Sequence, residues 1–176
     1  GYGKDIKKNL NLLLDGTIKG MDICVINGRP FVYVAGFGKF MQIPYNTPRK
    51  LKKKYGYMAY LLEGVKDFFN PTKMYDITYK VNGIEKRGLY SFMLISNANR
   101  IAGINNFYKD IKLDDNKFEV LLCNITKLKD IVKTLYFFAL YDASKIPGFY
   151  FYQTDNIKIK FNSPLKKPLC IDGESF

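Results

Sequence analysis

The chain has 176 residues, of which 47% are hydrophobic, and this predicts one folded domain with a substantial core rather than a disordered segment. Its 28 Lys and Arg residues against 16 Asp and Glu residues give a formal net charge of +12, which predicts an anionic partner: nucleic acid, an acidic membrane surface or a phosphorylated ligand. The absence of His excludes His-based triads and His-ligated metals, so any proton transfer must use Asp, Glu, Lys, Tyr or Cys.

The first predicted element is a helix at residues 4–14, because its apolar residues fall at helical spacing. These residues are Ile6, Leu10, Leu13 and Leu14. Gly16 suits the left-handed position that often follows the last turn of a helix. The pattern therefore predicts a short amphipathic helix closed by a glycine.

A β-hairpin is predicted next. The strand-like runs 21–26 and 31–35 flank Asn27-Gly28, a pair typical of tight hairpin turns. The second run continues into Ala-Gly-Phe-Gly at residues 35–38. Two glycines so close together indicate that the backbone there passes near another part of the molecule.

A longer helix is predicted from Thr47, as its N-cap, to the Asn70-Pro71 pair that ends it. Pro48 suits the first helical position. An apolar stripe at helical spacing is formed by Leu51, Tyr55, Met58, Leu62, Val65 and Phe69.

Strand signals dominate the second half of the chain, at residues 77–81, 89–96, 118–123, 148–152 and 157–161. Further hairpin turns are predicted at Asn82-Gly83 and Asp172-Gly173, and a third helix at residues 127–140. Strands outnumber helices and short turns join them. The predicted fold class is therefore α+β but mainly β: an antiparallel β-sandwich with a few peripheral helices.

Cysteine usage and hydropathy bear on the cellular location. Cys24, Cys123 and Cys170 lie far apart and form no Cys-x-x-Cys pair, which fits a reducing cytosol better than a disulfide framework or zinc site. No apolar run is long enough to cross a bilayer, and no signal peptide is visible. We therefore expect a cytoplasmic protein, and the start at Gly1 without Met suggests an excised domain.

The first candidate site is the segment 112–117, Lys-Leu-Asp-Asp-Asn-Lys, between two strand signals. Aspartates are common in turns, so the segment is consistent with a solvated loop. A hard cation such as Mg²⁺ also binds a carboxylate together with backbone carbonyls and waters, which a tight turn can present. From composition alone, both interpretations stay open.

The second candidate is Asp172-Gly173-Glu174. The local pattern predicts a hairpin turn in which Glu174 begins the next strand. A carboxylate held by a rigid hairpin can also accept a proton from a substrate hydroxyl. Because the chain lacks His, carboxylates are the leading candidates for a general base.

The third candidate is the basic stretch at residues 49–54, where five of six residues are Lys or Arg. It is consistent with a solvated helix face or with contact to anionic lipid headgroups, to which each Lys or Arg contributes on the order of 1 kcal/mol. The residues expected at a membrane are Arg49, Lys50, Lys52 and Lys53. Nucleic acid is the competing partner, although no zinc-finger spacing, RNP-type run or helix-turn-helix pattern is visible.

Four motifs, in this order along the chain, resemble the C-terminal domain of the soluble diacylglycerol and sphingosine kinase family. Residues 27–38 resemble its strand leading into Ala-Gly-Phe-Gly, and residues 47–60 resemble its Lys-rich helix with a Gly-x-x-Ala-Tyr pattern. Residues 112–117 resemble its Lys-Leu-Asp-Asp-Gly-Leu turn, and residues 171–174 its terminal Leu-Asp-Gly-Glu. The similarity spans nearly the whole chain.

The resemblance implies that residues 1–176 form one β-rich, substrate-side domain of a two-domain lipid kinase. The family's ATP site lies in a second domain that carries a Gly-Gly-Asp-Gly-Thr motif, and this sequence contains no such motif. The implied activity is the transfer of phosphate from ATP, with Mg²⁺, to the hydroxyl of diacylglycerol or a related lipid alcohol. The reaction is expected at a membrane surface and without a nucleic-acid partner. This chain alone is expected to be inactive. The alternative is a non-catalytic basic module that binds anionic membranes or nucleic acid.

The resemblance also assigns site residues. Glu174 takes the place of the family's proposed catalytic base. The family's structural magnesium site maps to the Asp115 carboxylate and the backbone carbonyls of Lys112 and Lys117. Asn116 replaces the family's turn glycine, and because Asn tolerates the left-handed conformation, the turn is expected to survive.

Overall fold

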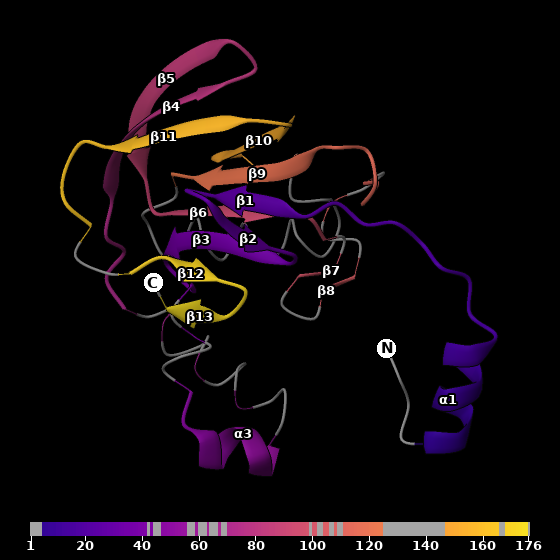
Figure 1. The fold of residues 1–176 in the computed structure, drawn as a ribbon. Helices are drawn as coiled ribbons and strands as arrows, with labels where there is room; N and C mark the ends of the chain where they lie inside the picture. The colour runs from indigo at the N-terminus through magenta and orange to yellow at the C-terminus, as the bar shows by residue number, and fades with distance from the viewer. Residues whose placement is uncertain are drawn as a thin grey trace.

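The computed structural model describes the chain at residues 5–41, 43, 47–55, 59, 63, 67, 70–98, 100–101, 104–105, 108, 111–124, 147–165 and 168–175. The predicted third helix at residues 127–140 lies outside the described residues, as does most of the second predicted helix beyond Tyr55. The described part is mainly antiparallel β-structure with two short helices, which confirms the predicted fold class (Figure 1).

The described helices are α1 (Ile6–Leu14) and α3 (Arg49–Tyr55). The strands of the first half are β1 (Cys24–Ile26), β2 (Arg29–Phe31), β3 (Val34–Gly38), β4 (Tyr75–Val81), β5 (Ile84–Tyr90) and β6 (Phe92–Ser96). Those of the second half are β7 (Arg100–Ile101), β8 (Ile104–Asn105), β9 (Phe118–Cys123), β10 (Phe149–Thr154), β11 (Ile157–Phe161), β12 (Cys170–Ile171) and β13 (Glu174–Ser175).

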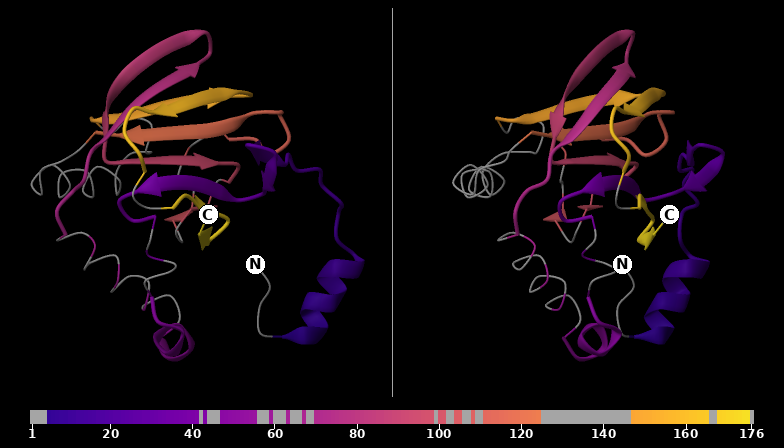
Figure 2. Two further views of the ribbon diagram at one scale, coloured as in Figure 1. Left: turned by 60° about the vertical axis from the view of Figure 1, so that its left-hand side comes forward. Right: turned by 90° about the vertical axis from the view of Figure 1, so that its left-hand side faces the viewer.

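Two sheets form the body of the molecule. The larger has six strands in the order β10-β9-β6-β3-β12-β13, and the smaller has three in the order β11-β4-β5. All of their strand pairs are antiparallel. Figures 1 and 2 show the stacked strands and the β4–β5 hairpin from several sides, and the pairs β1-β2 and β7-β8 form small separate sheets.

The main core lies between these two sheets. Ile77, Tyr79 and Val81 alternate along β4, and each is at most 1% exposed. They belong to the same buried cluster as Phe37 of β3, whose ring meets the Tyr75 ring edge to face at 5.2 Å between centroids. Full burial of each large apolar side chain contributes about 1.5–3 kcal/mol, so this layer holds the smaller sheet against the larger one.

The three predicted hairpin turns are confirmed. Both central residues have positive φ in Asn27-Gly28, Asn82-Gly83 and Asp172-Gly173, as a type I′ turn requires. The turns join β1 to β2, β4 to β5 and β12 to β13. Asn and Asp accept the left-handed conformation more readily than most residues, and Gly accepts it at no steric cost.

The strand paired with β1 was predicted incorrectly. The two-residue turn pairs β1 with residues 29–31, not with the run 31–35. The chain leaves this hairpin after Phe31, and β3 then enters the large sheet between β6 and β12. A two-residue turn brings together the residues that flank it directly, so the later run is available to a distant partner.

The predicted strand at residues 89–96 is two strands in different sheets. Ser91 separates them, and its amide and hydroxyl both donate to the Cys123 carbonyl oxygen, at 2.6 and 3.0 Å. Tyr90 therefore ends β5 in the small sheet, while Phe92 begins β6 in the large one. The buried hydrogen bonds of one serine place the crossover between the two sheets at this residue.

The glycines of the Ala-Gly-Phe-Gly run lie against backbone, as predicted. A Cβ at Gly36 would meet the Met93 carbonyl oxygen, and one at Gly38 would meet that of Ser91. Gly38 also has φ +96. These two positions therefore need glycine for close approach of β3 to its neighbouring strand.

The predicted first helix is present, but its end differs from the prediction. The Asp5 side chain accepts the Lys8 amide at 3.1 Å and caps the N-terminus. The helix ends at Asp15 in a right-handed conformation, and Gly16 does not have positive φ. A Cβ at Gly16 would lie 2.5 Å from the Leu12 carbonyl oxygen, so close approach rather than left-handed geometry explains this glycine.

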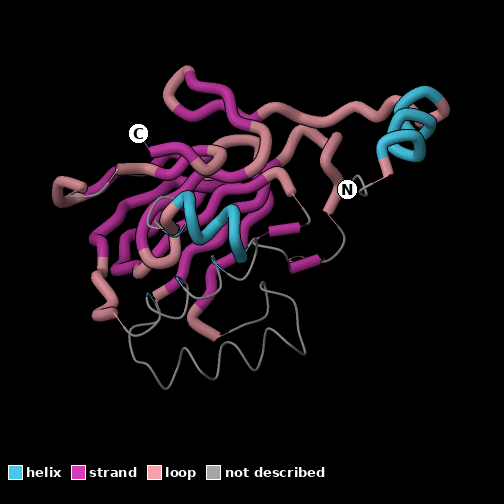
Figure 3. Tube along the Cα trace, turned by 90° about the horizontal axis from the view of Figure 1, so that it is seen from below, coloured by secondary structure: helices cyan, strands magenta, loops and turns pink. Residues whose placement is uncertain are grey.

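Both helices lie outside the sandwich, beyond the β13 edge of the large sheet (Figures 1 and 2). Viewed from below, α1 stands at one end of the molecule, apart from α3 and from the strands (Figure 3). Within the described residues, no helix has the length and apolar character needed to span a membrane.

Candidate functional site

The β12–β13 hairpin forms one edge of the large sheet. Cys170 and Ile171 pair with Gly36 and Ala35 of β3 on one side and with β13 on the other. Both residues of β12 are buried, whereas those of β13 are exposed. The hairpin therefore anchors one strand in the sheet and presents the other to the surroundings.

The Asp172 carboxylate braces this hairpin. Its Oδ2 accepts the Val32 amide at 2.9 Å, and its Oδ1 accepts the amides of Tyr33 and Val34 at 2.9 and 3.0 Å. The Asp172 amide donates in return to the Val34 carbonyl oxygen at 2.7 Å. Bonds between a carboxylate and backbone amides are stronger than neutral ones, so they fix the turn on the segment that leads into β3.

These contacts give the two carboxylates of the motif, Asp172 and Glu174, different environments. The Asp172 oxygens are engaged by backbone amides, which is a structural role. Glu174 lies on the exposed strand β13, directly opposite Ile171. Its side chain is therefore exposed while that of Asp172 is engaged, and the role of Glu174 as a base stays a prediction.

The turn at residues 112–117 has the predicted conformation. Asn116 has φ 57, in the left-handed region that the family's glycine would occupy. Oδ1 of Asp115 accepts the Lys117 amide at 3.1 Å, which closes the turn through its own side chain. The replacement of glycine by asparagine therefore leaves the turn intact.

Asp22, which the sequence analysis did not select, ties this turn to the start of β1. Its amide donates to the Leu113 carbonyl oxygen at 2.7 Å, and its carboxylate accepts the Asn116 amide at 2.7 Å. Its own carbonyl oxygen accepts the Asn97 side-chain amide at 2.8 Å. No local sequence pattern marks Asp22, because its partners lie far along the chain.

Negative charges from several elements act on the thiol of Cys24. Burial, together with the negative charges of Asp22, Glu119 and Asp172, raises the pKa of the Cys24 thiol to about 11. Cys24 is the first residue of β1. Asp22, which is hydrogen-bonded to the 112–117 turn, and Asp172 of the hairpin thus both act on the charge state of Cys24.

Glu119 is a second residue that sequence analysis missed. It is fully buried on β9, where the Gln153 side-chain amide donates to its Oε1 at 3.3 Å. Burial is the main cause that raises the pKa of Glu119 to about 7; the Gln153 hydrogen bond opposes the rise and the charge of Asp115 assists it. Its position inside the apolar run at residues 118–123 was the available signal.

The residues of the 112–117 turn fit a hard cation such as Mg²⁺ by their chemistry. Within the described residues, no group of three or more Asp, Glu, Cys or His side chains is arranged to hold a metal. A site here therefore depends on one carboxylate, Asp115, completed by backbone carbonyls and water, a donor set that Mg²⁺ accepts. The Asp22 carboxylate, which accepts the Asn116 amide, adds negative charge beside this turn.

The basic stretch is helical but lies elsewhere. Arg49, Lys50 and Lys53 are exposed on α3, beyond the β13 edge of the sheet (Figure 1). Lys54 lies over the Tyr55 ring at 5.1 Å from its centroid. Lys52 belongs to the same helix, and its side chain is outside the described part of the structure. The exposure of these side chains does not test the predicted membrane contact, which stays a prediction.

Comparisons with known proteins support the resemblance. No family model matches the chain. It is 25% identical over 171 residues to a diacylglycerol kinase of Bacillus subtilis, and 26% identical over 170 residues to one of Staphylococcus epidermidis. Each match covers 97% of this chain, but only 55% and 53% of the respective relative.

Solved structures give the same picture of the fold. A diacylglycerol kinase structure from Bacillus anthracis superposes with a TM-score of 0.70 at 19% identity, over 99% of this chain and 55% of that one. Another B. anthracis structure superposes with a TM-score of 0.75 at 18% identity, over 98% and 55%. The shared fold and the continuous sequence match agree: the chain is a relative of the bacterial diacylglycerol kinases and spans about half of their length.

Proposed function

We propose that the chain is the substrate-side part of an ATP-dependent lipid kinase that phosphorylates the hydroxyl of diacylglycerol or a related lipid alcohol. The observation that carries the proposal is the match to diacylglycerol kinases along 97% of the chain. Since the match covers nearly the whole chain, the 112–117 turn and the β12–β13 hairpin are both part of the domain that it describes. The exposed position of Glu174 beside the engaged Asp172 supports a chemical role for this hairpin.

Glu174 is the general base in this proposal. A lipid alcohol is a weak acid, so its proton must leave as its oxygen bonds to the γ-phosphorus of ATP. The Glu174 carboxylate accepts that proton, the bond from the γ-phosphorus to the bridging oxygen breaks, and ADP departs with the electron pair. The Asp172 contacts hold the hairpin so that the base keeps its position during transfer.

Mg²⁺ has a structural place in the proposal. The Asp115 carboxylate and the carbonyl oxygens of Lys112 and Lys117 would hold it, as the resemblance implies. When bound, the cation would supply positive charge beside the carboxylates of this region. Asp115 meanwhile shapes the turn through the Lys117 amide, and Asp22 fastens the turn to β1.

ATP binding and membrane contact involve partners of this domain. ATP would be bound by a nucleotide-binding domain in the portion of the kinase that this chain does not cover. The basic surface of α3, with Arg49, Lys50, Lys52 and Lys53, would contact the anionic membrane that carries the lipid. A net charge of +12 favours such a surface, and added salt should weaken the contact.

The decisive experiment assays the full-length protein that contains this chain. Radiolabelled ATP, Mg²⁺ and a panel of lipid alcohols are presented in vesicles, one set neutral and one anionic. We expect transfer to diacylglycerol or a related lipid alcohol, faster on anionic vesicles. Absence of transfer to every lipid by a folded, ATP-binding protein would contradict the proposal.

Two additions sharpen the assay. Asp115→Ala should shift the Mg²⁺ dependence or lower stability, whereas Asp114→Ala, its exposed neighbour, is the matched control.

Calorimetry of the 176-residue chain with Mg-ATP should show no binding, because the chain offers no phosphate-binding glycine loop. Micromolar binding would place the nucleotide site within this chain and overturn the assignment of ATP to a second domain.

A further inference from the structure

Three lysines lie together on the outer face of the small sheet, the face turned away from the core. Lys158 and Lys160 are exposed on β11, where they alternate with apolar residues that pack against the core. Lys80 is exposed on β4 and is the direct antiparallel partner of Lys158. Lys160 is the partner of Thr78, the next outward residue along β4. We call Lys80, Lys158 and Lys160 the lysine face.

The charges of the lysine face are unpaired in the described part of the chain. None of the three lysines forms an ion pair with any residue that the structure describes. Glu85 of β5 is the partner of Lys80 in the strand pair, but the two form no ion pair. Like charges directly opposite each other destabilise a strand pair, and Lys80 with Lys158 is such a case. A bound anion would relieve this repulsion, so the face favours an anionic partner.

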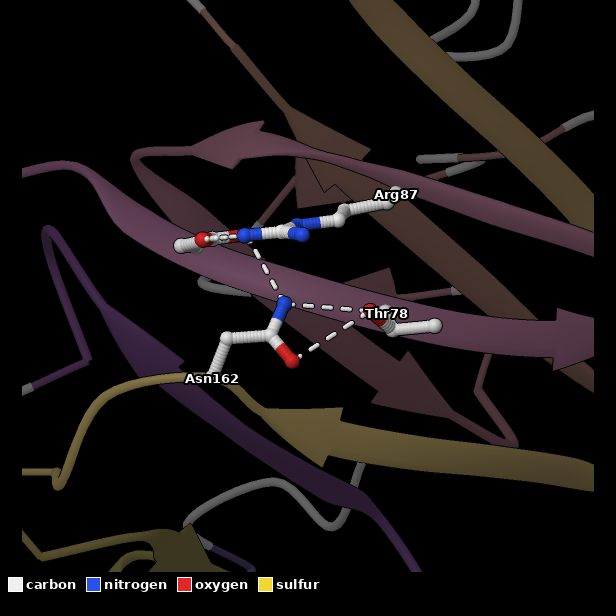
Figure 4. Close-up of polar contacts among 4 residues, drawn as sticks. Thr78, Arg87 and Asn162 are labelled. Carbon is white, nitrogen blue, oxygen red and sulfur yellow. Dashed lines mark hydrogen bonds and ion pairs between the residues drawn. The ribbon is translucent and has the colours of Figure 1, made fainter.

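The surface beside the lysine face is fixed by hydrogen bonds (Figure 4). Asp76 of β4 forms an ion pair with Arg87 of β5, at 2.6 Å from Nη2 to Oδ2. Asn162, which follows β11, donates to the Asp76 carboxylate at 2.8 Å and to the Thr78 hydroxyl at 3.0 Å. These bonds join the three strands and neutralise Arg87, so the lysines carry the uncompensated positive charge of this face. A surface already fixed in this way loses little conformational freedom when a partner binds.

A membrane or a nucleic acid fits this face less well than a protein. The small sheet and α3 lie at opposite ends of the molecule (Figures 1 and 2), so a bilayer that contacts the basic α3 would lie away from the lysine face. The outward residues of the three strands include no aromatic side chain on which a base could stack. A second copy of this chain would present the same positive charge and be repelled. An acidic protein is the partner that remains.

An extended acidic segment matches the spacing of the lysines. Successive outward residues of one strand, such as Lys158 and Lys160, are about 7 Å apart, and carboxylates at every second position of an extended segment repeat at the same distance. Leu89, which is 56% exposed on the same face of β5, offers an apolar contact beside the charged area. We propose that the lysine face docks an extended acidic segment of a partner protein. The proposal is independent of the kinase activity, because neither ATP nor Glu174 takes part.

The test measures how fluorescently labelled polyglutamate binds to the full-length protein that contains this chain. Lys80→Gln, Lys158→Gln and Lys160→Gln, combined in one lysine-face variant, should weaken binding by about tenfold or more at low salt. Added salt should weaken binding to the wild type. The variant should unfold at a temperature no lower than the wild type, because it removes the repulsion between Lys80 and Lys158. Weaker binding in this variant then does not report misfolding.

A matched variant removes the same amount of charge elsewhere. Lys7→Gln, Lys8→Gln and Lys19→Gln change three exposed lysines of the N-terminal segment and should change binding by less than about twofold. Equal losses in the two variants would mean that polyglutamate responds only to net charge, which overturns the proposal.

The remaining outcomes separate this proposal from other partners and from the kinase activity. Tighter binding of oligodeoxythymidylate than of polyglutamate, lost in the lysine-face variant, would assign the face to nucleic acid. Loss of anionic-vesicle binding in the same variant would assign it to a membrane, and either result overturns the proposal. Polyglutamate binding at this face by a protein without lipid kinase activity would overturn the proposed function and retain the docking.

Discussion

The hairpins β4–β5 and β12–β13 are built on the same turn and serve different purposes. Asn82-Gly83 and Asp172-Gly173 both adopt positive φ at two successive residues. The first hairpin has strands of seven residues, and alternate side chains of β4, with Tyr90 of β5, belong to the core between the sheets. The second has strands of two residues and depends on the Asp172 carboxylate for its position.

The carboxylates of the two hairpins show the same contrast. Asp76 on β4 forms a two-pronged ion pair with Arg87 of β5, at 3.0 and 2.6 Å. Asn162, just after β11, donates to Asp76 at 2.8 Å and bonds to Thr78, so the cluster joins all three strands (Figure 4). This acidic group is satisfied within its own sheet, whereas Glu174 is presented outward. Two hairpins with the same type of turn therefore differ in whether their carboxylates are engaged within the sheet.

The largest expected effect is on catalysis. Glu174→Gln in the full-length protein keeps the size of the side chain but removes its ability to accept a proton. Turnover should fall by about 10²–10⁴-fold, while folding and ATP affinity change little. Steady-state kinase assays with diacylglycerol vesicles measure it.

The control comes from the other hairpin. Glu85→Gln changes an exposed glutamate close to the Asn82-Gly83 turn and should leave turnover unchanged. Asp172→Asn is assayed in parallel, because it is the rival carboxylate. Near-normal turnover in a folded Glu174→Gln protein would exclude Glu174 as the base.

The next effect is on stability. Asp172→Ala removes three hydrogen bonds from backbone amides to a carboxylate, so the free energy of unfolding should fall by at least about 2 kcal/mol. Urea unfolding of the 176-residue chain measures it. Asp172→Asn keeps one acceptor oxygen and should lose less. If Asp172→Ala unfolds at the wild-type urea concentration, the carboxylate does not hold this hairpin.

A smaller loss is expected at the equivalent position of the longer hairpin. Asn82→Ala forces alanine to a φ near 49 and removes the bond from the Asn82 amide to the Gln153 carbonyl oxygen at 3.2 Å. The free energy of unfolding should fall by about 1–2 kcal/mol. Asn82→Gly loses the same bond without the backbone strain, so it should be milder. Equal losses in both variants would show that the bond, not the conformation, matters.

The smallest effect concerns pH. Hydrogen bonds from Arg87 and Asn162 lower the pKa of Asp76 from 3.8 to about 2. A carboxyl with a lowered folded-state pKa stabilises the protein above its unfolded pKa, and the contribution is lost as pH falls from about 4 to about 2. Arg87→Ala should reduce this loss, seen as a flatter fall in the thermal midpoint between pH 5 and 2, while Glu85→Gln serves as the control. An unchanged slope in Arg87→Ala would mean that the pair does not shift Asp76.

Local sequence was a good guide wherever neighbouring residues set the geometry. The pairs Asn27-Gly28, Asn82-Gly83 and Asp172-Gly173 predicted their turns because backbone torsions depend on the residues that adopt them. Alternation predicted β4 and β11, since one face of each strand packs on the core. The expectation that Asn116 would keep the 112–117 turn came from the family resemblance, and its φ of 57 agrees with it.

Long-range contacts decided the rest. The strand paired with β1, the crossover at Ser91 and the burial of Glu119 depend on segments distant in sequence. Local sequence placed two carboxylates at one turn but could not show which of them would be engaged by hydrogen bonds. The tertiary structure engages Asp172 with amides 138–140 residues away and leaves Glu174 exposed, because hydrogen-bond partners are set by the packing of strands and not by neighbours along the chain.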